Sequence, residues 1–327
     1  MRRVLARFAP VLHLTRVSTA FAAVGNVWFV ILWTRATEEE PGTAALTLRP
    51  LWLLLIGGAA SATGLYAFGA ALNDLLDTKR DRALRPERPI ASGQLPLEAA
   101  LSVVAGTLMV AVLGATVFGT TATVLTLALA AAILVFNAAG KFIPAVGLVL
   151  LGLIYAGHML VPNPSLRFVW PVWLVMTHAL VVAAVCHRIA RKVPTISARA
   201  GVAAAAGWAL STIVLLWAGM GRRDEGDGLW PDWVSPGAAI PPLLLAVLCA
   251  AWCWRRVRMT GPGPRAAEKV GRYGALWLTL YGAGWLFGAG HTPEAWILVA
   301  LAVAGFAGMT VLREWYALME DPVAYRR

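Results

Sequence analysis

The sequence predicts an all-α integral membrane protein, a polytopic bundle of nine to ten transmembrane helices. Of the 327 residues, 59% are hydrophobic and only 14% are charged, whereas ordinary soluble domains carry roughly 25% charged residues. A soluble protein of this composition would expose large apolar patches to water, and a disordered chain would be less hydrophobic. Three cysteines are too few for a disulfide framework. The composition therefore excludes soluble, disordered and disulfide-stapled proteins.

Ten stretches without Asp, Glu, Lys or Arg are candidates for transmembrane helices, because a helix needs about 20 apolar residues to cross the hydrocarbon. In chain order they are Val17–Trp33, Pro50–Leu72, two spans within Ala99–Gly140 that turn at residues 119–121, Phe142–Leu166, Phe168–Cys186, Ala200–Gly221, Trp233–Trp254, Tyr273–Pro293 and Ala295–Leu312. Backbone groups in lipid must be satisfied within the segment, so each stretch is expected to be helical. The last two are separated by so short a segment that nine spans remain an alternative.

The basic residues are distributed unevenly between the two sides of the membrane. If the N-terminus is cytoplasmic and all ten stretches cross, all but five of the 28 Lys and Arg residues fall on the cytoplasmic side, as the positive-inside tendency predicts. The five exceptions are Arg35, Arg49, Arg167, Arg222 and Arg223. Lysine is scarce among the basic residues, which is typical of a GC-rich bacterial genome. We therefore expect a bacterial inner (plasma) membrane protein with a cytoplasmic N-terminus.

A polar segment separates the second and third spans. Asn73, Asp77 and Asp81 recur at intervals of four residues, so they share one face if the second helix continues inward. Asp74 flanks that face. Oxygen ligands arranged in this way suit Mg²⁺, which prefers carboxylates combined with phosphate oxygens and water. The segment therefore predicts a magnesium site at the cytoplasmic end of the second span.

Basic residues follow this acidic segment directly. Arg85 and Arg88 can bind phosphate oxygens in forked geometry. Acidic and basic groups together predict a site for a metal-bridged diphosphate at the membrane surface. The alternative is a solvated loop whose mixed charges only set the topology, but Lys and Arg alone would do that, so the carboxylates favour the diphosphate site.

At these residues the sequence resembles the UbiA-type intramembrane prenyltransferase superfamily. The pattern Asn-x3-Asp-x3-Asp, present as Asn73, Asp77 and Asp81, is similar to that family's first aspartate-rich motif, and Arg88-Pro89-Ile90-x-Ser92-Gly93 resembles its continuation. Three further residues fit the family more loosely, namely Arg16, Asn26 and Lys141. The resemblance covers roughly residues 10–290 of an expected single transmembrane domain, 1–327. The family is usually described with nine spans, so 295–312 is expected to be an extra C-terminal helix.

The resemblance implies a helical bundle around a central cavity that opens laterally to lipid. It implies an enzyme, a transferase of alkyl or aryl groups other than methyl, that moves a polyprenyl group from an isoprenoid diphosphate to a hydrophobic, aromatic or lipid-like acceptor. The implied Mg²⁺ ligands and catalytic residues are Asn73, Asp77 and Asp81, with Asp74 beside them. The implied diphosphate-binding residues are, in descending order, Arg85, Arg88, Lys141, Arg188 and Lys192. Membrane lipids are expected partners, and nucleic acid is not.

The segment between the sixth and seventh spans departs from the family pattern. Family members carry a second aspartate-rich motif there, whereas residues 183–195 contain no carboxylate. Basic residues stand in its place, namely His187, Arg188, Arg191 and Lys192. In one interpretation these fixed cations replace a second metal and hold the diphosphate directly. In another the ionisation chemistry is lost and the protein is a non-catalytic lipid-binding or transport protein, and in a third the charges only set topology.

Histidines and tryptophans are further candidates for functional residues inside the bundle. His158 and His178 fall within spans, where ionisable residues are usually functional. No acidic residue lies within a span to support a proton relay, so packing or hydrogen bonding into the cavity is expected for both. Fifteen tryptophans could line a cavity that stabilises a carbocation, but most lie near span ends, as interfacial anchors do.

Overall fold

The computed structural model describes residues 2–16, 19–222 and 228–320. Val17, where the first span was expected to begin, and Arg223 lie outside these residues. Thirteen α-helices and no β-strand occur in the described part of the chain. The long helices are α2 (Phe21–Ala36), α4 (Leu51–Leu76), α6 (Leu97–Thr116), α7 (Thr120–Ala138), α8 (Pro144–Met159), α9 (Trp170–Ile189), α10 (Ala198–Met220), α11 (Ile240–Thr260), α12 (Pro264–Gly288) and α13 (Thr292–Glu320). The short elements are α1 (Arg2–Thr15), α3 (Ala44–Leu48), α5 (Thr78–Leu84) and the 3-10 turns η2 (Gly140–Phe142) and η3 (Pro236–Ala239).

Each expected span corresponds to one long helix, but the helix ends differ from the ends of the apolar stretches. Seven helices are long and apolar enough to cross a membrane, namely α4, α6, α7, α9, α10, α11 and α13. The helices α2 and α8 are apolar but only 16 residues long, and α12 begins with a charged turn. The protein is an all-helical polytopic membrane protein with seven candidate spans among its described residues.

Proline, basic residues and glycine near the ends of these helices explain where the helices begin and end. Helix α8 ends at Met159, before the Pro162-Asn163-Pro164 run that cannot continue a helix. Helix α11 runs past Trp254 to Thr260, because its basic last turn is favourable at a helix C-terminus. Helices α12 and α13 are separate, and Gly290 in the turn between them adopts φ 88°, a left-handed conformation that favours glycine.

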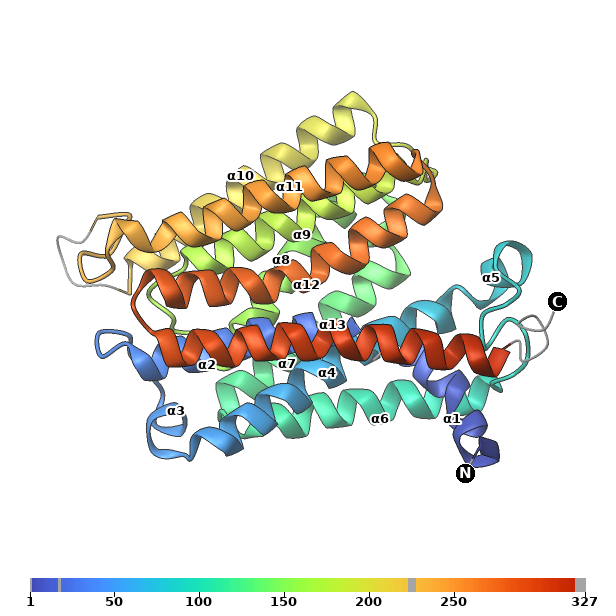
Figure 1. The fold of residues 1–327 in the computed structure, drawn as a ribbon, viewed down its shortest axis with the longest axis horizontal. Coiled ribbons are helices and arrows are strands. Elements are labelled where there is room, and N and C mark those ends of the chain that lie inside the picture. Colours follow the sequence, from blue (N-terminus) through green and yellow to red (C-terminus); the bar gives the residue numbers. More distant parts are fainter. Residues whose placement is uncertain (1, 17–18, 223–227, 321–327) are drawn as a thin grey trace.

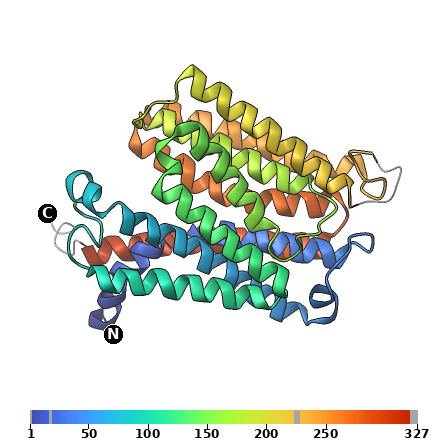
Figure 2. The same cartoon turned by 180° about the vertical axis from the view of Figure 1, so that it is seen from behind.

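The helices form two groups that share α2 (Figure 1). One hydrophobic cluster joins α2, α4, α6 and α7 and includes Ile154 of α8, and the other joins α2 with α8, α9, α12 and α13. Seen from behind, α7 lies between α4 and α6 of the first group and α8 of the second (Figure 2). Glycine permits the close packing of α4 on α6, since a Cβ at Gly64 would lie 2.5 Å from the backbone nitrogen of Ala111. Small residues at such interfaces are typical of membrane helices.

The two ends of the bundle differ in chemistry. Helices α1 and α5 lie at one end and α3 at the other (Figure 1). At the α3 end, Trp33 stacks on Phe168 with ring centroids 4.9 Å apart, and Trp230, Trp233 and Trp285 pack around Phe168. These tryptophans form an aromatic cluster at this end, and no described tryptophan is among the residues that line the two cavities at the other end.

Candidate diphosphate and metal site

The junction of α4 and α5 presents the Asn-x3-Asp-x3-Asp motif. Helix α4 ends at Leu76 and α5 begins at Thr78, but the helical hydrogen bonds continue through the junction. The amide of Asp77 donates to the carbonyl of Asn73 at 3.0 Å, and the amide of Asp81 donates to the carbonyl of Asp77 at 2.8 Å. The three side chains therefore keep the four-residue spacing that places them on one face.

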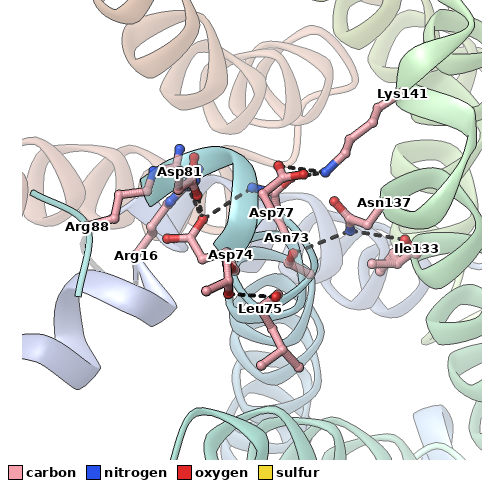
Figure 3. A network of polar contacts seen from close by, with 12 residues as sticks. Arg16, Asn73, Asp74, Leu75, Asp77, Asp81, Arg88, Ile133, Asn137 and Lys141 are labelled. Atoms are coloured by element: carbon pink, nitrogen blue, oxygen red, sulfur yellow. Dashed lines mark hydrogen bonds and ion pairs between the residues drawn. The ribbon is translucent and has the colours of Figure 1, made fainter. Parts of the chain in front are cut away.

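Lys141 binds two of these side chains from a distant part of the chain. Its Nζ donates to Asp77 Oδ2 at 2.7 Å and to Asn73 Oδ1 at 3.0 Å (Figure 3). The lysine comes from η2, the short turn between α7 and α8. Only 15% of the Lys141 side chain is exposed, so the ion pair lies in a partly desolvated site where charges interact strongly.

Arg88 joins the remaining two carboxylates of the segment. Its Nη1 lies 2.8 Å from Asp74 Oδ1 and 2.7 Å from Asp81 Oδ2 (Figure 3). Asp74 also accepts hydrogen bonds from Arg16 at 2.8 Å and from the Asn73 amide at 3.2 Å. Asp74 is almost fully buried and positions these arginines. Arg88, expected to bind phosphate, is here engaged with protein carboxylates.

A cavity of about 450 Å³ opens beside these groups. It is bounded by α4, α5, η2, α8, α9 and the loop that follows α9. The sequence-predicted residues that line it are Arg16, Asn73, Asp77, Asp81, Arg85, Arg88, Lys141, His187 and Lys192. The predicted residues that are not among its lining are Asn26, Asp74, Arg188 and Arg191. The structure therefore gathers most of the predicted site from four segments of the chain.

The turn that ends α9 places some of the nearby basic residues at the cavity and others outside it. Arg191 adopts φ 50°, and the amide of Lys192 donates to the carbonyl of His187 at 3.1 Å, as in a Schellman helix end. This turn carries Lys192 to the cavity, whereas Arg188 and Arg191 are exposed outside its lining. His187 lines the cavity and hydrogen-bonds the carbonyl of Pro194 at 2.8 Å.

Electrostatic repulsion acts on Lys192. Desolvation at the cavity wall lowers the pKa of its ammonium, and the nearby guanidinium groups lower it further. These groups are Arg85, Arg80 and Arg16, while Cys186 opposes the shift. A concentration of cations at a cavity attracts an anion, and a bound anion would relieve this repulsion.

A second cavity of about 240 Å³ adjoins the first. Both are lined by Arg16, Asn73, Phe136 and Leu151. The second cavity continues between α2, α4, α7, α8 and α12, with walls that are mostly apolar. Its polar side chains away from the junction are Tyr66, Asn137, Tyr155 and His158. The site thus combines a charged outer chamber with a largely apolar inner one.

The oxygen donors at the charged chamber fit Mg²⁺. Asn73, Asp77 and Asp81 supply amide and carboxylate oxygens, which this ion prefers. The ammonium of Lys141 already contacts two of these oxygens, so the structure places a cation between Asn73 and Asp77. No cluster of three or more His, Cys, Asp or Glu side chains suited to a metal occurs in the described part of the chain. The fit therefore depends on one mixed amide and carboxylate set.

The chain matches one known protein family over most of its length. The model of the UbiA prenyltransferase family matches residues 26–270. The chain belongs to this family. Its helix α13 lies wholly outside the matched region of this UbiA-family chain. Among curated proteins, none matches the chain.

Solved structures that resemble the chain are similar to it at low sequence identity. A structure described for digeranylgeranylglyceryl phosphate synthase is 16% identical with a TM-score of 0.52, covering 86% of this chain and 98% of that one. A UbiA homologue from Aeropyrum pernix K1, without ligand, is 18% identical with a TM-score of 0.41, covering 91% and 97%. A UbiA homologue from Archaeoglobus fulgidus, bound to GPP and Mg²⁺, is 13% identical with a TM-score of 0.44, covering 92% and 100%. At these identities the likeness concerns the fold alone.

Several residues that line this UbiA-family site were not predicted from the sequence. Arg80 lines the charged cavity, and its position three residues after Asp77 on the same helical face could have indicated it. Tyr66 and Tyr155 line the inner cavity from different helices, and no local pattern marks them. Phe136 and Asn137 come from the end of α7, where the apolar stretch gave no sign of a site.

Proposed function

We propose that this UbiA-family chain is a membrane-embedded prenyltransferase, which moves a polyprenyl group from an isoprenoid diphosphate to a hydrophobic, aromatic or lipid-like acceptor. The observation that carries the proposal is the pair of adjoining cavities, one lined by cations and carboxylates and one largely apolar. A prenyl diphosphate has the same division between a charged head and an apolar chain. The charged chamber would hold the diphosphate, with the reacting carbon at the junction of the chambers.

The reaction balances without an added oxidant or reductant. The bond between the allylic carbon and the diphosphate oxygen breaks, and its electron pair leaves with the diphosphate. The acceptor supplies an electron pair for the new bond to that carbon and loses one proton to water. Fixed cations aimed at the departing diphosphate favour this step because negative charge develops there. The candidates that line the cavity without a carboxylate partner in the described structure are Arg80, Arg85 and Lys192.

Asn73, Asp77 and Asp81 would hold Mg²⁺ in this site. The bound ion would add positive charge against the leaving diphosphate. Lys141 keeps Asn73 and Asp77 facing the cavity, and Arg88 keeps Asp81 in place. Apolar residues on α8, Leu148 and Leu151, help to exclude water, which would otherwise capture a carbocation.

The composition of the loop after α9 favours an arrangement with one metal ion on the Asn-x3-Asp-x3-Asp motif and fixed cations opposite it. Residues 183–195 contain no carboxylate, while His187 and Lys192 line the cavity facing the motif. We therefore place the second phosphate on this basic loop. The same missing carboxylates favour the other candidate, a non-catalytic lipid-binding or transport protein on this scaffold, which would bind an isoprenoid lipid without releasing diphosphate.

The proposed protein is a single transmembrane domain over residues 1–327. Nine to ten spans follow if the short helices α2 and α8 and the inner part of α12 also cross. The site would then face the cytoplasm of a bacterium, with the cavity open laterally to the lipid of the inner membrane. The basic loops on the site end support this orientation.

Removal of the central carboxylate tests the proposal. Asp77→Ala should abolish Mg²⁺-dependent binding of geranyl diphosphate and Mg²⁺-dependent diphosphate release with an acceptor panel. Glu87→Ala is the matched control, because Glu87 is an exposed carboxylate of the same segment that does not line the cavity. Full activity of purified Asp77→Ala would refute the site. Binding of the donor by the wild type without diphosphate release from any acceptor would favour the lipid-binding candidate.

A further inference from the structure

One face of α11 carries an exposed apolar stripe that ends in basic residues. The large apolar side chains of this face are each more than half exposed, namely Ile240, Leu243, Leu244, Val247, Leu248 and Trp254. Their spacing of three and four residues places them on one face of the helix, and the exposed residues Arg255 and Arg258 continue the same face. Another face of α11 packs on α12. The stripe is therefore turned toward lipid, and the arginines lie at its end.

The length of α11 places these arginines at the level of the lipid headgroups. Ile240 and Arg258 lie about 27 Å apart along the helix axis, and the hydrocarbon core of a bilayer is about 30 Å thick. The turn that joins α11 to α12 lies at the same end of the bundle as α5 (Figure 1). The stripe therefore ends on the side of the membrane that carries the charged cavity.

Two tryptophan rings hold arginines at this end of α11. The guanidinium carbon of Arg258 lies 4.2 Å from the ring centroid of Trp254, and that of Arg256 lies 5.5 Å from the ring centroid of Trp252. Trp252 in turn contacts Tyr273 of α12, with ring centroids 5.1 Å apart. A guanidinium stacked on a ring keeps the N–H donors at its edge available, and these can bind phosphate oxygens in forked geometry. The rings therefore restrict two arginines without using their donors.

The positive charge at this end of α11 is not paired within the described part of the chain. Arg255, Arg256 and Arg258 take part in no ion pair among the described residues. Glu268 is the one carboxylate between residues 252 and 273, and it pairs with Arg272. The C-terminus of a helix offers only about half an elementary charge to such cations. None of the three arginines lines either cavity, so the donor site does not account for them.

We propose that this face of α11 binds an anionic phospholipid, with the phosphate of the headgroup at Arg255 and Arg258 and an acyl chain along the apolar stripe. Clusters of basic residues next to the cytoplasmic end of a transmembrane helix attract anionic lipids. A zwitterionic lipid would leave the arginines uncompensated, and a soluble phosphate would leave the stripe unused. Arg256, held on Trp252 beside α12, adds charge at the flank of the site. The binding of this lipid does not depend on the proposed prenyl transfer.

Removal of the two exposed arginines tests this proposal. The purified full chain in mild detergent is offered phosphatidylglycerol and phosphatidylcholine with the same acyl chains, and native mass spectrometry measures the ratio in which they bind. The wild type should prefer phosphatidylglycerol. The double variant Arg255→Gln, Arg258→Gln should lower this preference at least about 5-fold, the contribution of one arginine near an anionic headgroup. An unchanged preference would overturn the proposal and leave these arginines with a role in topology alone.

The matched control is the double variant Arg82→Gln, Arg199→Gln. Both arginines are exposed on elements that begin at the same end of the bundle, and neither lies over an aromatic ring of the described residues. This variant removes the same charge and should change the preference less than about 2-fold. A loss as large as in Arg255→Gln, Arg258→Gln would overturn the proposal, since general positive charge would then attract the lipid.

Removal of a ring tests the position of the phosphate. Trp254→Leu keeps every charge but removes the ring on which Arg258 is stacked. It should lower the preference for phosphatidylglycerol about 2- to 5-fold, the contribution of a cation–π contact at an exposed site. An unchanged preference in this variant would overturn the placement of the phosphate at Arg258.

A competition experiment distinguishes a lipid from a soluble phosphate. Glycerol 3-phosphate has the phosphate without acyl chains, so it should not displace phosphatidylglycerol at equal concentration. Displacement would assign the arginines to a soluble anion and overturn the lipid site. The outcome is separate from the proposed function, because Asp77→Ala alters the charged cavity and should keep the wild-type lipid preference. Loss of the preference in Asp77→Ala would mean that the lipid binds in the cavity, and the site on α11 would be refuted.

Discussion

The two walls of the charged cavity differ in how far their charged groups are paired within the protein. On the α4–α5 wall, Asp74, Asp77 and Asp81 each lie within 2.8 Å of a cationic nitrogen. On the wall formed by the loop after α9, Lys192 makes no ion pair with the described residues, and the guanidinium groups of Arg85, Arg80 and Arg16 disfavour its charged form. The three carboxylates of the first wall are therefore neutralised within the protein and fixed in place, whereas Arg80 and Arg85 of the same segment have no carboxylate partner among the described residues. The other wall retains uncompensated positive charge, which is what an anionic ligand requires.

The largest effect should come from breaking the neutralised wall. Arg88→Ala leaves the buried Asp81 without its ion-pair partner and removes one of two arginines from Asp74. Breaking a buried ion pair by removing one partner costs about 3 kcal/mol, so the free energy of unfolding should fall by about that amount. Denaturant unfolding in mild detergent measures the loss.

The control for this variant is Arg85→Ala. Arg85 is an exposed arginine of the same segment and makes no ion pair among the described residues, so its removal should change stability by less than about 0.5 kcal/mol. Equal unfolding free energies for Arg88→Ala and the wild type would mean that the acidic wall is not held by this arginine.

Reversal of charge on the opposite wall should have the next largest effect. The double variant His187→Asp, Arg191→Asp places carboxylates in the loop that lacks them. If fixed cations hold the phosphate there, the affinity for geranyl diphosphate should fall more than about 10-fold, because a carboxylate at position 187 lines the cavity and would repel a phosphate with an energy comparable to the about 1.5–3 kcal/mol of a charged hydrogen bond. Equilibrium binding with and without Mg²⁺ measures the change. Tighter Mg²⁺-dependent binding would instead mean that the loop is a metal site whose acids were lost.

The sequence predicts one wall of this site far better than the other. Asn73, Asp77 and Asp81 follow a local helical spacing, which survives because the helical hydrogen bonds continue through the α4–α5 junction. The contact of Lys141 with Asp77 joins residues 64 positions apart, and only tertiary packing creates it. The same holds for Arg88, which the sequence assigned to phosphate and the fold assigns to carboxylates.

Helix ends limit the prediction of the fold and of the basic wall. Apolar stretches locate every long helix, but the helices run past the first charged residue or stop at a proline, so the number of spans does not follow from the stretches alone. After α9, the left-handed conformation of Arg191 decides that Lys192 and not Arg188 lines the cavity. Composition cannot distinguish these neighbouring cations.

This distinction between neighbouring cations provides a smaller and sharper test. Lys192→Ala should weaken binding of geranyl diphosphate about 10-fold, the lower end for a charged hydrogen bond at a partly exposed site. Arg188→Ala removes a charge four residues away that lies outside the cavity lining, and it should change the affinity by less than about 2-fold after screening by salt. Titration of both purified variants in the same buffer checks the difference. Equal losses would mean that general positive charge, and not the cavity wall, attracts the donor.

The smallest effect is a pH dependence of donor binding that Lys192 should produce. Desolvation and the neighbouring arginines Arg85, Arg80 and Arg16 lower the pKa of Lys192 in the free protein, with Cys186 opposing them. A bound diphosphate favours the ammonium, so the pKa rises in the complex. Linkage then requires constant affinity below the pKa of the free protein, a fall as the pH rises between the two pKa values, and a new plateau above them.

The fall in affinity can reach at most the loss seen in Lys192→Ala and should begin at a lower pH than an ordinary lysine would give. Binding of geranyl diphosphate across alkaline buffers, where the donor is fully ionised, measures it. Lys192→Arg keeps the positive charge through this range because arginine does not lose its proton, so its affinity should remain flat. A wild-type curve as flat as that of Lys192→Arg would mean that Lys192 does not touch the donor, and the basic wall would then act only through its remaining charges.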